Sequence, residues 1–269
     1  MRGASRLGAL AGVALVALLP ALGCVPALPP PRPLPERSAS SSASAAEFLA
    51  RAEGAFARRP DVAAVREAES LFLDAAAADE RAVDGLLGAM RADVWLVERG
   101  KLDGAGREAK AVAAVEAGQW CERRAPESAA CRYWLALALG LQARERPRTS
   151  TEGLKLMVEK LRQAAAADPA LDSAGPERVL AVVLLRAPPW PIGPGDAEAG
   201  LAEARKAVAL RPDHPPNQLA LAEALLANGA RAEGREAAQR AVDLAGARAA
   251  TGDPDAPAWV REGQKLLAR

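Results

Sequence analysis

The chain has 269 residues, enough to bury a core, and half of them are hydrophobic although only 3% are aromatic. Alanine, the residue with the best helix propensity, is abundant. β-Sandwiches and β-barrels need β-branched and aromatic residues on their pleated faces, so this composition favours closely packed helices. The formal net charge is +1, and no local run of Lys and Arg supplies the concentrated positive field that nucleic-acid binding needs. The composition therefore excludes a nucleic-acid partner.

The first 23 residues have the layout of a secretory signal peptide. Arg2 and Arg6 precede an uncharged apolar run from Leu7 to Leu22, which small residues follow. The run is broken by Gly12 and is shorter than the roughly 20 residues of a spanning helix. A membrane-spanning anchor remains the alternative. Removal of the leader would change the net charge from +1 to −1.

The leader ends in Ala21-Leu22-Gly23-Cys24, which resembles the lipobox of bacterial lipoproteins. Gly23 agrees with the lipobox pattern, whereas the usual Leu stands one place late. The resemblance implies cleavage before Cys24, acylation of that cysteine and, with Val25 in place of Asp, an outer-membrane location facing the periplasm. A core cysteine is the alternative, but Cys24 stands directly before a proline-rich stretch.

Residues 24–45 are expected to form a lipidated tether. The segment is proline-rich and then serine-rich, and neither half carries enough apolar surface to offset the entropy of ordering. The proline part is expected to be a semi-rigid spacer that extends about 3.1 Å per residue.

From residue 46 onward, helix-period apolar stripes alternate with short clusters of Pro and Gly, which predicts ten or eleven helices. Residues 195–212 align with residues 229–246 at a constant offset of 34, with Gly200 on Gly234 and Ala204 on Ala238. A helix-turn-helix unit of 34 residues is the spacing of tetratricopeptide repeats.

Further residues resemble that family at positions where two helices approach closely. Trp134, Leu137, Ala138 and Leu141 have the spacing of its first helix, and Ala68, Phe72 and Ala75 have that of its second. The resemblance implies an all-α, right-handed solenoid of antiparallel helix pairs, with degenerate helical repeats over 46–125. Over 126–269 it implies more regular repeats and a C-terminal capping helix. Segments 144–150 and 188–194 look like insertions, and an irregular helical bundle is the alternative.

Several residues are candidates for particular roles. Cys121 and Cys131 lie on either side of a tight turn between helices, where an exported protein can form a disulfide, and two buried thiols are the alternative. Trp190, on a proline-stiffened loop, is a candidate partner-binding residue, although it could instead fold back over a helix end. Trp134, on a first helix, is a second candidate, with core packing as its alternative. His214 is expected to be an exposed turn residue.

A functional prediction follows from the leader, the tether and the repeats together. It is a lipid-anchored scaffold of the cell envelope that binds an envelope protein or peptide and could form a homo-oligomer. No cofactor, metal site or catalytic residue is predicted, because no nucleophile, phosphate loop or second metal ligand stands near His214. Residues 177–226 also resemble the T-component lipoproteins of TRAP-type transporters. That resemblance implies docking of a periplasmic solute-binding protein or transfer of a hydrophobic ligand.

Overall fold

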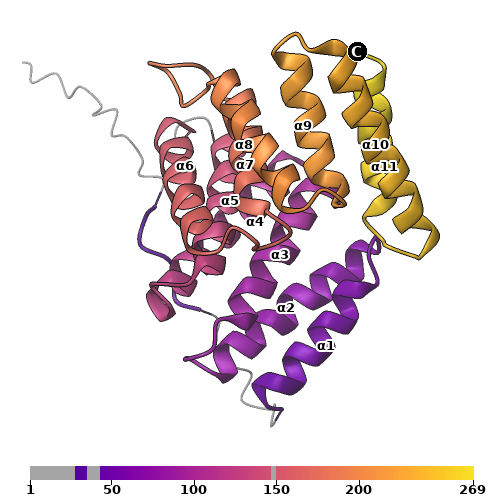
Figure 1. Ribbon diagram of the computed structural model, residues 1–269. Helices are drawn as coiled ribbons and strands as arrows, with labels where there is room; N and C mark the ends of the chain where they lie inside the picture. Colours follow the sequence, from indigo (N-terminus) through magenta and orange to yellow (C-terminus); the bar gives the residue numbers. More distant parts are fainter. Residues whose placement is uncertain (1–27, 35–42, 147–149) are drawn as a thin grey trace, which may run out of the picture.

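A computed structural model describes residues 28–34, 43–146 and 150–269. Within these ranges the chain forms eleven α-helices and no strand, so the predicted all-α fold class is confirmed (Figure 1). The helices are α1 (Ala45–Ala57), α2 (Val62–Ala78), α3 (Asp84–Arg99), α4 (Gly104–Arg124), α5 (Ala129–Glu145), α6 (Ser150–Ala167), α7 (Gly175–Arg186), α8 (Ala197–Leu210), α9 (Pro215–Ala227), α10 (Arg231–Ala250) and α11 (Ala256–Leu267). Across the described ranges, none of these helices combines the length and the apolar character that crossing a bilayer requires.

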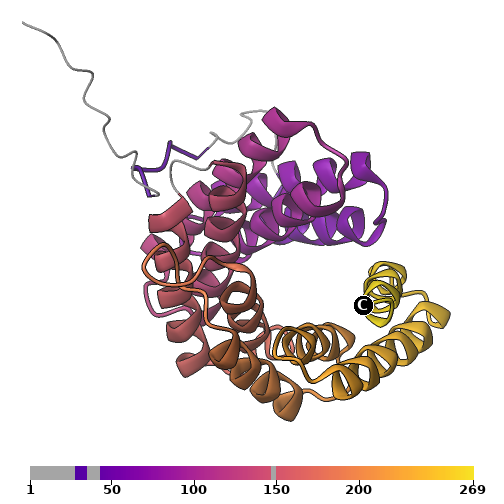
Figure 2. The ribbon, with the colours of Figure 1, turned by 90° about the horizontal axis from the view of Figure 1, so that it is seen from above.

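The helices pack as five consecutive pairs, α1 with α2 through α9 with α10, and α11 covers the last pair. Each odd-numbered helix also contacts the next odd-numbered helix, so that these helices form a continuous inner layer. Seen from above, the pairs follow a curved arc (Figure 2). The predicted helical solenoid is confirmed.

Side-chain caps begin several helices where the sequence offers a short polar residue. Ser44 and Glu47 form a reciprocal capping box at α1, and Asp196 accepts a hydrogen bond from the backbone N–H of Ala199 at α8. These caps satisfy backbone N–H groups that have no partner inside the helix.

The 34-residue repeat corresponds to two equivalent close contacts. A Cβ added to Gly200 would lie 2.9 Å from Leu185 Cγ, and one added to Gly234 would lie 2.8 Å from Leu226 Cγ. The two glycines are 34 residues apart, whereas the two leucines are 41 residues apart. The difference equals the seven residues 188–194, which are therefore inserted between the two helices of one pair.

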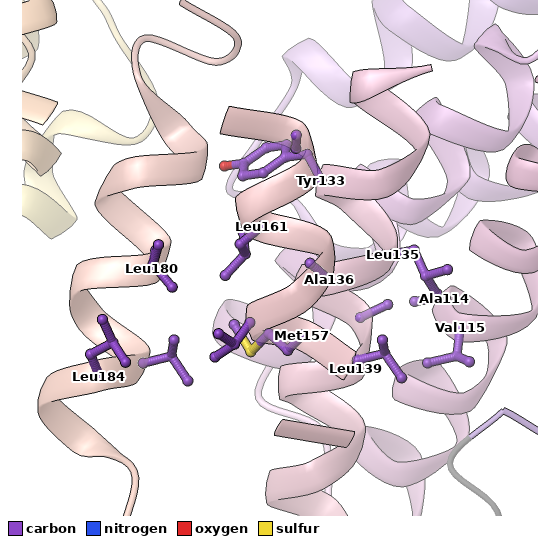
Figure 3. Packing of buried hydrophobic residues seen from close by; sticks show 14 residues of the cluster. Ala114, Val115, Tyr133, Leu135, Ala136, Leu139, Met157, Leu161, Leu180 and Leu184 are labelled. Carbon is purple, nitrogen blue, oxygen red and sulfur yellow. The ribbon is translucent and has the colours of Figure 1, made fainter. Parts of the chain in front are cut away.

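The largest buried cluster joins α4, α5, α6 and α7. Leu180 and Leu184 of α7 point toward Met157 and Leu161 of α6 (Figure 3). Small side chains such as Ala136 let these helices approach closely, which is why a chain with few aromatic residues still forms a packed interior.

The N-terminal predictions fall partly on described residues. Residues 1–23 and Cys24 lie outside them. Residues 28–34 lie along the outer side of the arc against α4 (Figure 2). Leu28 and Leu34 pack against buried clusters of the body, so this part of the expected spacer is bound to the helices instead of standing away from them. Composition alone missed the contact because two leucines among the prolines supply the apolar surface.

Candidate functional site

A pocket of about 610 Å³ opens on the inner side of the arc. It is bounded by the inner helices α3, α5, α7, α9 and α11, with side chains of α6 at one end. Its volume lies within the range of about 300–1,000 Å³ that is typical of ligand sites. The lining residues are mostly apolar: Val94, Leu137, Gly140, Leu141, Leu154, Met157, Val179, Val182, Val183, Leu219, Ala220 and Trp259, with Glu98, Arg99, Arg144, Arg178, Arg186, Glu223 and Glu262 among the charged ones.

The pocket is built from one pattern that three inner helices repeat. Besides Ala143 of α5 and Arg178 of α7, helix α5 contributes residues 137, 140, 141 and 144, α7 contributes 179, 182, 183 and 186, and α9 contributes 216, 219, 220 and 223. Each set has the spacing i, i+3, i+4, i+7, which places four side chains on one face of a helix. The first three members are apolar or glycine and the fourth is charged. The repeats therefore stack into an apolar wall with a charged rim.

Ion pairs between successive inner helices neutralise this rim. Arg144 Nη1 lies 2.7 Å from Glu98 Oε1, and Arg186 donates to both carboxylate oxygens of Glu223, at 2.8 and 2.6 Å. Arg186 also lies 4.0 Å from Glu262 of α11. The hydrogen bond to Glu223 raises the pKa of Arg186, while burial raises the pKa of Glu262. The rim offers paired charges of both signs at the edge of an apolar floor.

A polar network holds the inner helices in register beside the pocket. Tyr133 Oη donates to Asp172 Oδ2 at 2.5 Å, and Arg178 donates to the same oxygen at 2.8 Å. Arg178 also donates to Asn217 Oδ1 at 3.0 Å, and Asn217 donates to the carbonyl of Ser173. Residues 172–174 have positive φ angles of 47°, 56° and 64°, a region that non-glycine residues rarely adopt. The network holds this turn and joins α5, α7 and α9.

The two cysteines that were predicted to pair are bonded to each other. Cys121, near the end of α4, and Cys131, near the start of α5, have Cα atoms 5.4 Å apart. Both side chains are fully buried. The bond joins the second helix of one pair to the first helix of the next.

The structure does not bring the two candidate tryptophans together. Trp190 is 86% exposed on the loop between α7 and α8, beside the exposed Ile192. It therefore does not fold back over a helix end. Trp134 is half-buried and packs against two core clusters, outside the pocket lining. Its surroundings match the core-packing alternative.

His214 differs from the sequence expectation of an exposed turn residue. It is half-buried at the start of α9, and its ring lies 5.9 Å from that of Trp259. The C-terminal helix α11 causes the difference, since it places Trp259 over the turn.

The pocket was not predicted from the sequence. The spacing i, i+3, i+4, i+7 with a terminal charge is a signal that could have found it. However, the three sets begin at residues 137, 179 and 216, so their separations differ from 34. In the described ranges, no group of three or more His, Cys, Asp or Glu residues is placed to hold a metal ion.

Comparison with known proteins supports the fold. TTC0263, a thermophilic TPR protein of Thermus thermophilus, aligns with a TM-score of 0.61 and 21% identity, over 83% of this chain and 100% of its own. Two MamA structures, one of them the RS-1 ArsTM double mutant, align with TM-scores of 0.47 and 0.48, at 14% and 17% identity. They cover 78% of this chain and 96% and 97% of their own. No protein-family model and no curated protein matches the sequence. The likeness to TTC0263 shows that the fold is a tetratricopeptide-like solenoid.

Proposed function

We propose that this protein is a non-enzymatic scaffold of the cell envelope and that its inner pocket binds a segment of a partner protein. The observation that carries the proposal is the stacked apolar wall of α5, α7 and α9 with its rim of paired charges. Such a surface accepts apolar side chains on its floor, while the rim offers both donors and acceptors to a peptide backbone. The exposed Trp190 loop is a second, separate contact for the partner, because aromatic side chains dominate interface energetics.

The anchor is part of the same proposal. Acylation of Cys24 would attach the chain to the outer membrane on its periplasmic side. Only residues 25–27 separate Cys24 from the docked Leu28, and four Cα steps span at most about 14 Å. The anchor would therefore hold the outer face beside α4 close to the bilayer. The pocket on the inner side of the arc stays available to a partner.

Site-specific photo-crosslinking tests the scaffold. A photoreactive amino acid at position 182, in the pocket wall, is expected to give a defined adduct with an envelope protein. The same group at Leu210, a 40% exposed position on α8, is the matched control and is expected to give no such adduct. Leu137→Glu places a charge in the pocket and is expected to abolish the adduct while the helical circular dichroism stays unchanged. Identical adducts from positions 182 and 210 would refute the pocket as the binding site.

A second candidate function is carriage of a hydrophobic ligand, as in a TRAP-type T-component. The size and apolar lining of the pocket favour it, because about 610 Å³ accommodates an acyl chain. Native mass spectrometry of the detergent-solubilised protein separates the two candidates. A bound lipid that Leu137→Glu removes would support carriage, and a ligand-free protein that still crosslinks from position 182 would support the scaffold.

A further inference from the structure

Residues 28–34 meet the body with a three-residue period. Leu28 and Leu34 are half-buried and Pro31 is buried, whereas the residues at 30, 32 and 33 are exposed; Pro29, between them, is also half-buried. A polyproline II helix has three residues per turn, so every third side chain lies on the same face. The segment therefore presents one face of such a helix to the protein. It lies on the outer side of the arc (Figure 2), whereas the pocket described above is lined by the inner helices.

Helix α4 contacts the backbone of this segment at a matching interval. Gln119 Nε2 donates to the carbonyl of Pro29 at 2.9 Å, and Trp120 Nε1 donates to the carbonyl of Arg32 at 2.8 Å. The two carbonyls are three residues apart, which is one turn of polyproline II. Proline has no N–H group, so a proline-rich backbone can be recognised only through its carbonyl oxygens and its side chains.

A charged contact adds specificity for arginine. Arg32 lies with Nε 2.8 Å from Glu116 Oε1 and Nη2 2.9 Å from Glu116 Oε2, a bidentate geometry that lysine cannot reproduce. Glu116 is 19% exposed, whereas Arg32 is 74% exposed. The carboxylate thus belongs to the body, and the guanidinium approaches it from solvent.

The segment covers a cleft that it does not fill. A cavity of about 320 Å³ remains beneath Arg32 and Leu34, bounded by Glu69, Asp93 and Trp120. Asp93 is buried, and its Oδ1 lies 3.3 Å from Lys110 Nζ. Burial and the neighbouring Glu69 raise the pKa of Asp93 above its usual range. The body therefore has an open cleft with acidic groups beneath the docked residues.

The hydrogen bonds to the carbonyl oxygens, the bidentate ion pair and the apolar contacts together resemble the contacts by which a protein binds a separate peptide. We propose that Glu116, Gln119 and Trp120 of α4 form a recognition site for a proline-rich, arginine-bearing peptide, and that residues 28–34 of the same chain occupy it. The occupant is pre-organised, because proline fixes φ and little conformational entropy is lost on docking. A segment of the same chemistry from another molecule can bind only when the chain's own segment leaves.

Peptide competition in the full chain tests the proposal. The probe is a fluorescein-labelled peptide with the sequence of residues 28–34, titrated by fluorescence anisotropy. Arg32→Glu places a negative charge opposite Glu116 and releases the chain's own segment, so it is expected to bind the probe at least tenfold more tightly than wild type. Adding Trp120→Phe, which keeps an aromatic ring but removes the indole N–H, is expected to weaken that binding at least tenfold.

Two further variants serve as controls: one that reverses the charges of the Arg32–Glu116 pair, and one that changes a surface charge elsewhere. The double variant Arg32→Glu/Glu116→Arg restores the pair within the chain and also repels the arginine of the probe, so it is expected to bind the probe no more tightly than wild type. Lys206→Glu alters an exposed pair on α8 and is expected to match wild type. Failure of Arg32→Glu to bind the probe would overturn the proposal, because the contacts would then depend only on covalent tethering. Equal binding by wild type, Arg32→Glu and the Trp120→Phe variant would also overturn it.

Discussion

At the scale of single residues, His214 makes stability depend on pH. Burial, reinforced by the positive charges of Arg178 and Arg248, lowers the pKa of this histidine to about 4. The unfolded chain has a histidine pKa of about 6.5. As the pH falls below that value, the histidine becomes protonated in the unfolded state but stays neutral in the native state. The contribution of His214 is therefore fully present above pH 6.5 and is lost progressively toward pH 4.

We expect the wild type to lose about 1 kcal/mol of unfolding free energy through His214 between pH 7 and pH 5, allowing for the partial exposure of the ring. Urea unfolding at both pH values, with His214→Gln as the comparison, measures this loss. The variant should show a shallower decline, because it lacks the titrating ring while the carboxylates are the same in both proteins. Parallel pH profiles for the two proteins would show that His214 has no such effect.

Two glycines on helices should respond oppositely to the same substitution. A Cβ at Gly85 would lie 2.5 Å from the carbonyl oxygen of Phe72 and 2.6 Å from the backbone nitrogen of Ala76. Backbone atoms cannot swing aside, so Gly85→Ala is expected to separate α2 from α3 and to cost about 2 kcal/mol. Gly54 has no atom within 4 Å of the corresponding position, and Gly54→Ala should add about 0.5–1 kcal/mol through helix propensity. Chemical denaturation of both variants measures their unfolding free energies. Equal changes in unfolding free energy for the two substitutions would argue against the close approach of α3 to α2 at Gly85.

At the scale of elements, the regular 34-residue spacing could predict α8 and α10 because nothing interrupts the chain between Gly200 and Gly234. The same spacing could not predict the pocket. Its residues on α5, α7 and α9 are separated by 42 and then 37 residues, since loops of unequal length join the helices. The spacing of a repeat along the sequence changes whenever a loop changes in length. The stacking of the helices does not change, because it depends only on which helix faces are in contact. Insertions in loops therefore hide a repeat that the packed helices preserve.

The sequence spacing also fails to predict the packing of the earlier helix pairs. The sequence loses the repeat register near α3, yet α3 packs against both α2 and α4. Gly85 and Gly88 permit the approach of α3 to α2, and a Cβ at Gly88 would lie 2.2 Å from the ring of Phe72. These glycines are not among the residues that carry the family spacing, so that spacing could not predict the close approach. The docking of residues 28–34 on α4 was likewise invisible, because its donors lie 90 and 88 residues away in sequence.

The disulfide is a covalent link between α4 and α5. It closes a loop of ten residues, for which the chain-entropy model gives about 2–3 kcal/mol of stabilisation. In a Cys24→Ala background, a reductant should lower the unfolding free energy by about this amount, and Cys121→Ala/Cys131→Ala should remove the response to the reductant. Thiol titration of the unfolded, unreduced protein should detect no free cysteine in that background. Two titratable thiols would show that the pair is not bonded.

At the scale of the whole molecule, stacked pairs make most contacts local, as solenoids do. Ion pairs join equivalent helices of successive pairs, such as Lys160 of α6 with Glu122 of α4 and Arg186 of α7 with Glu223 of α9. The ion pairs of Asp255 span a greater distance along the chain. Asp255, in the turn before α11, pairs with Arg99 at the end of α3 and lies 3.5 Å from Arg59 in the turn between α1 and α2. The turn between α10 and α11 therefore contacts the first two helix pairs across the open side of the arc.

This contact should set the width of the arc more than it sets stability. Asp255 is 23% exposed and Arg99 is 35% exposed, and pairs of this kind contribute about 0–1 kcal/mol. Asp255→Arg replaces attraction by repulsion and should increase the radius of gyration in small-angle X-ray scattering, while the midpoint of urea unfolding moves little. Asp243→Arg changes the charge equally on the exposed side of α10 and should leave the radius unchanged. Because Arg99 and Glu262 also line the pocket, the widened arc should weaken crosslinking from position 182 without unfolding the chain. An unchanged scattering profile for Asp255→Arg would mean that packing between neighbouring pairs alone fixes the curvature.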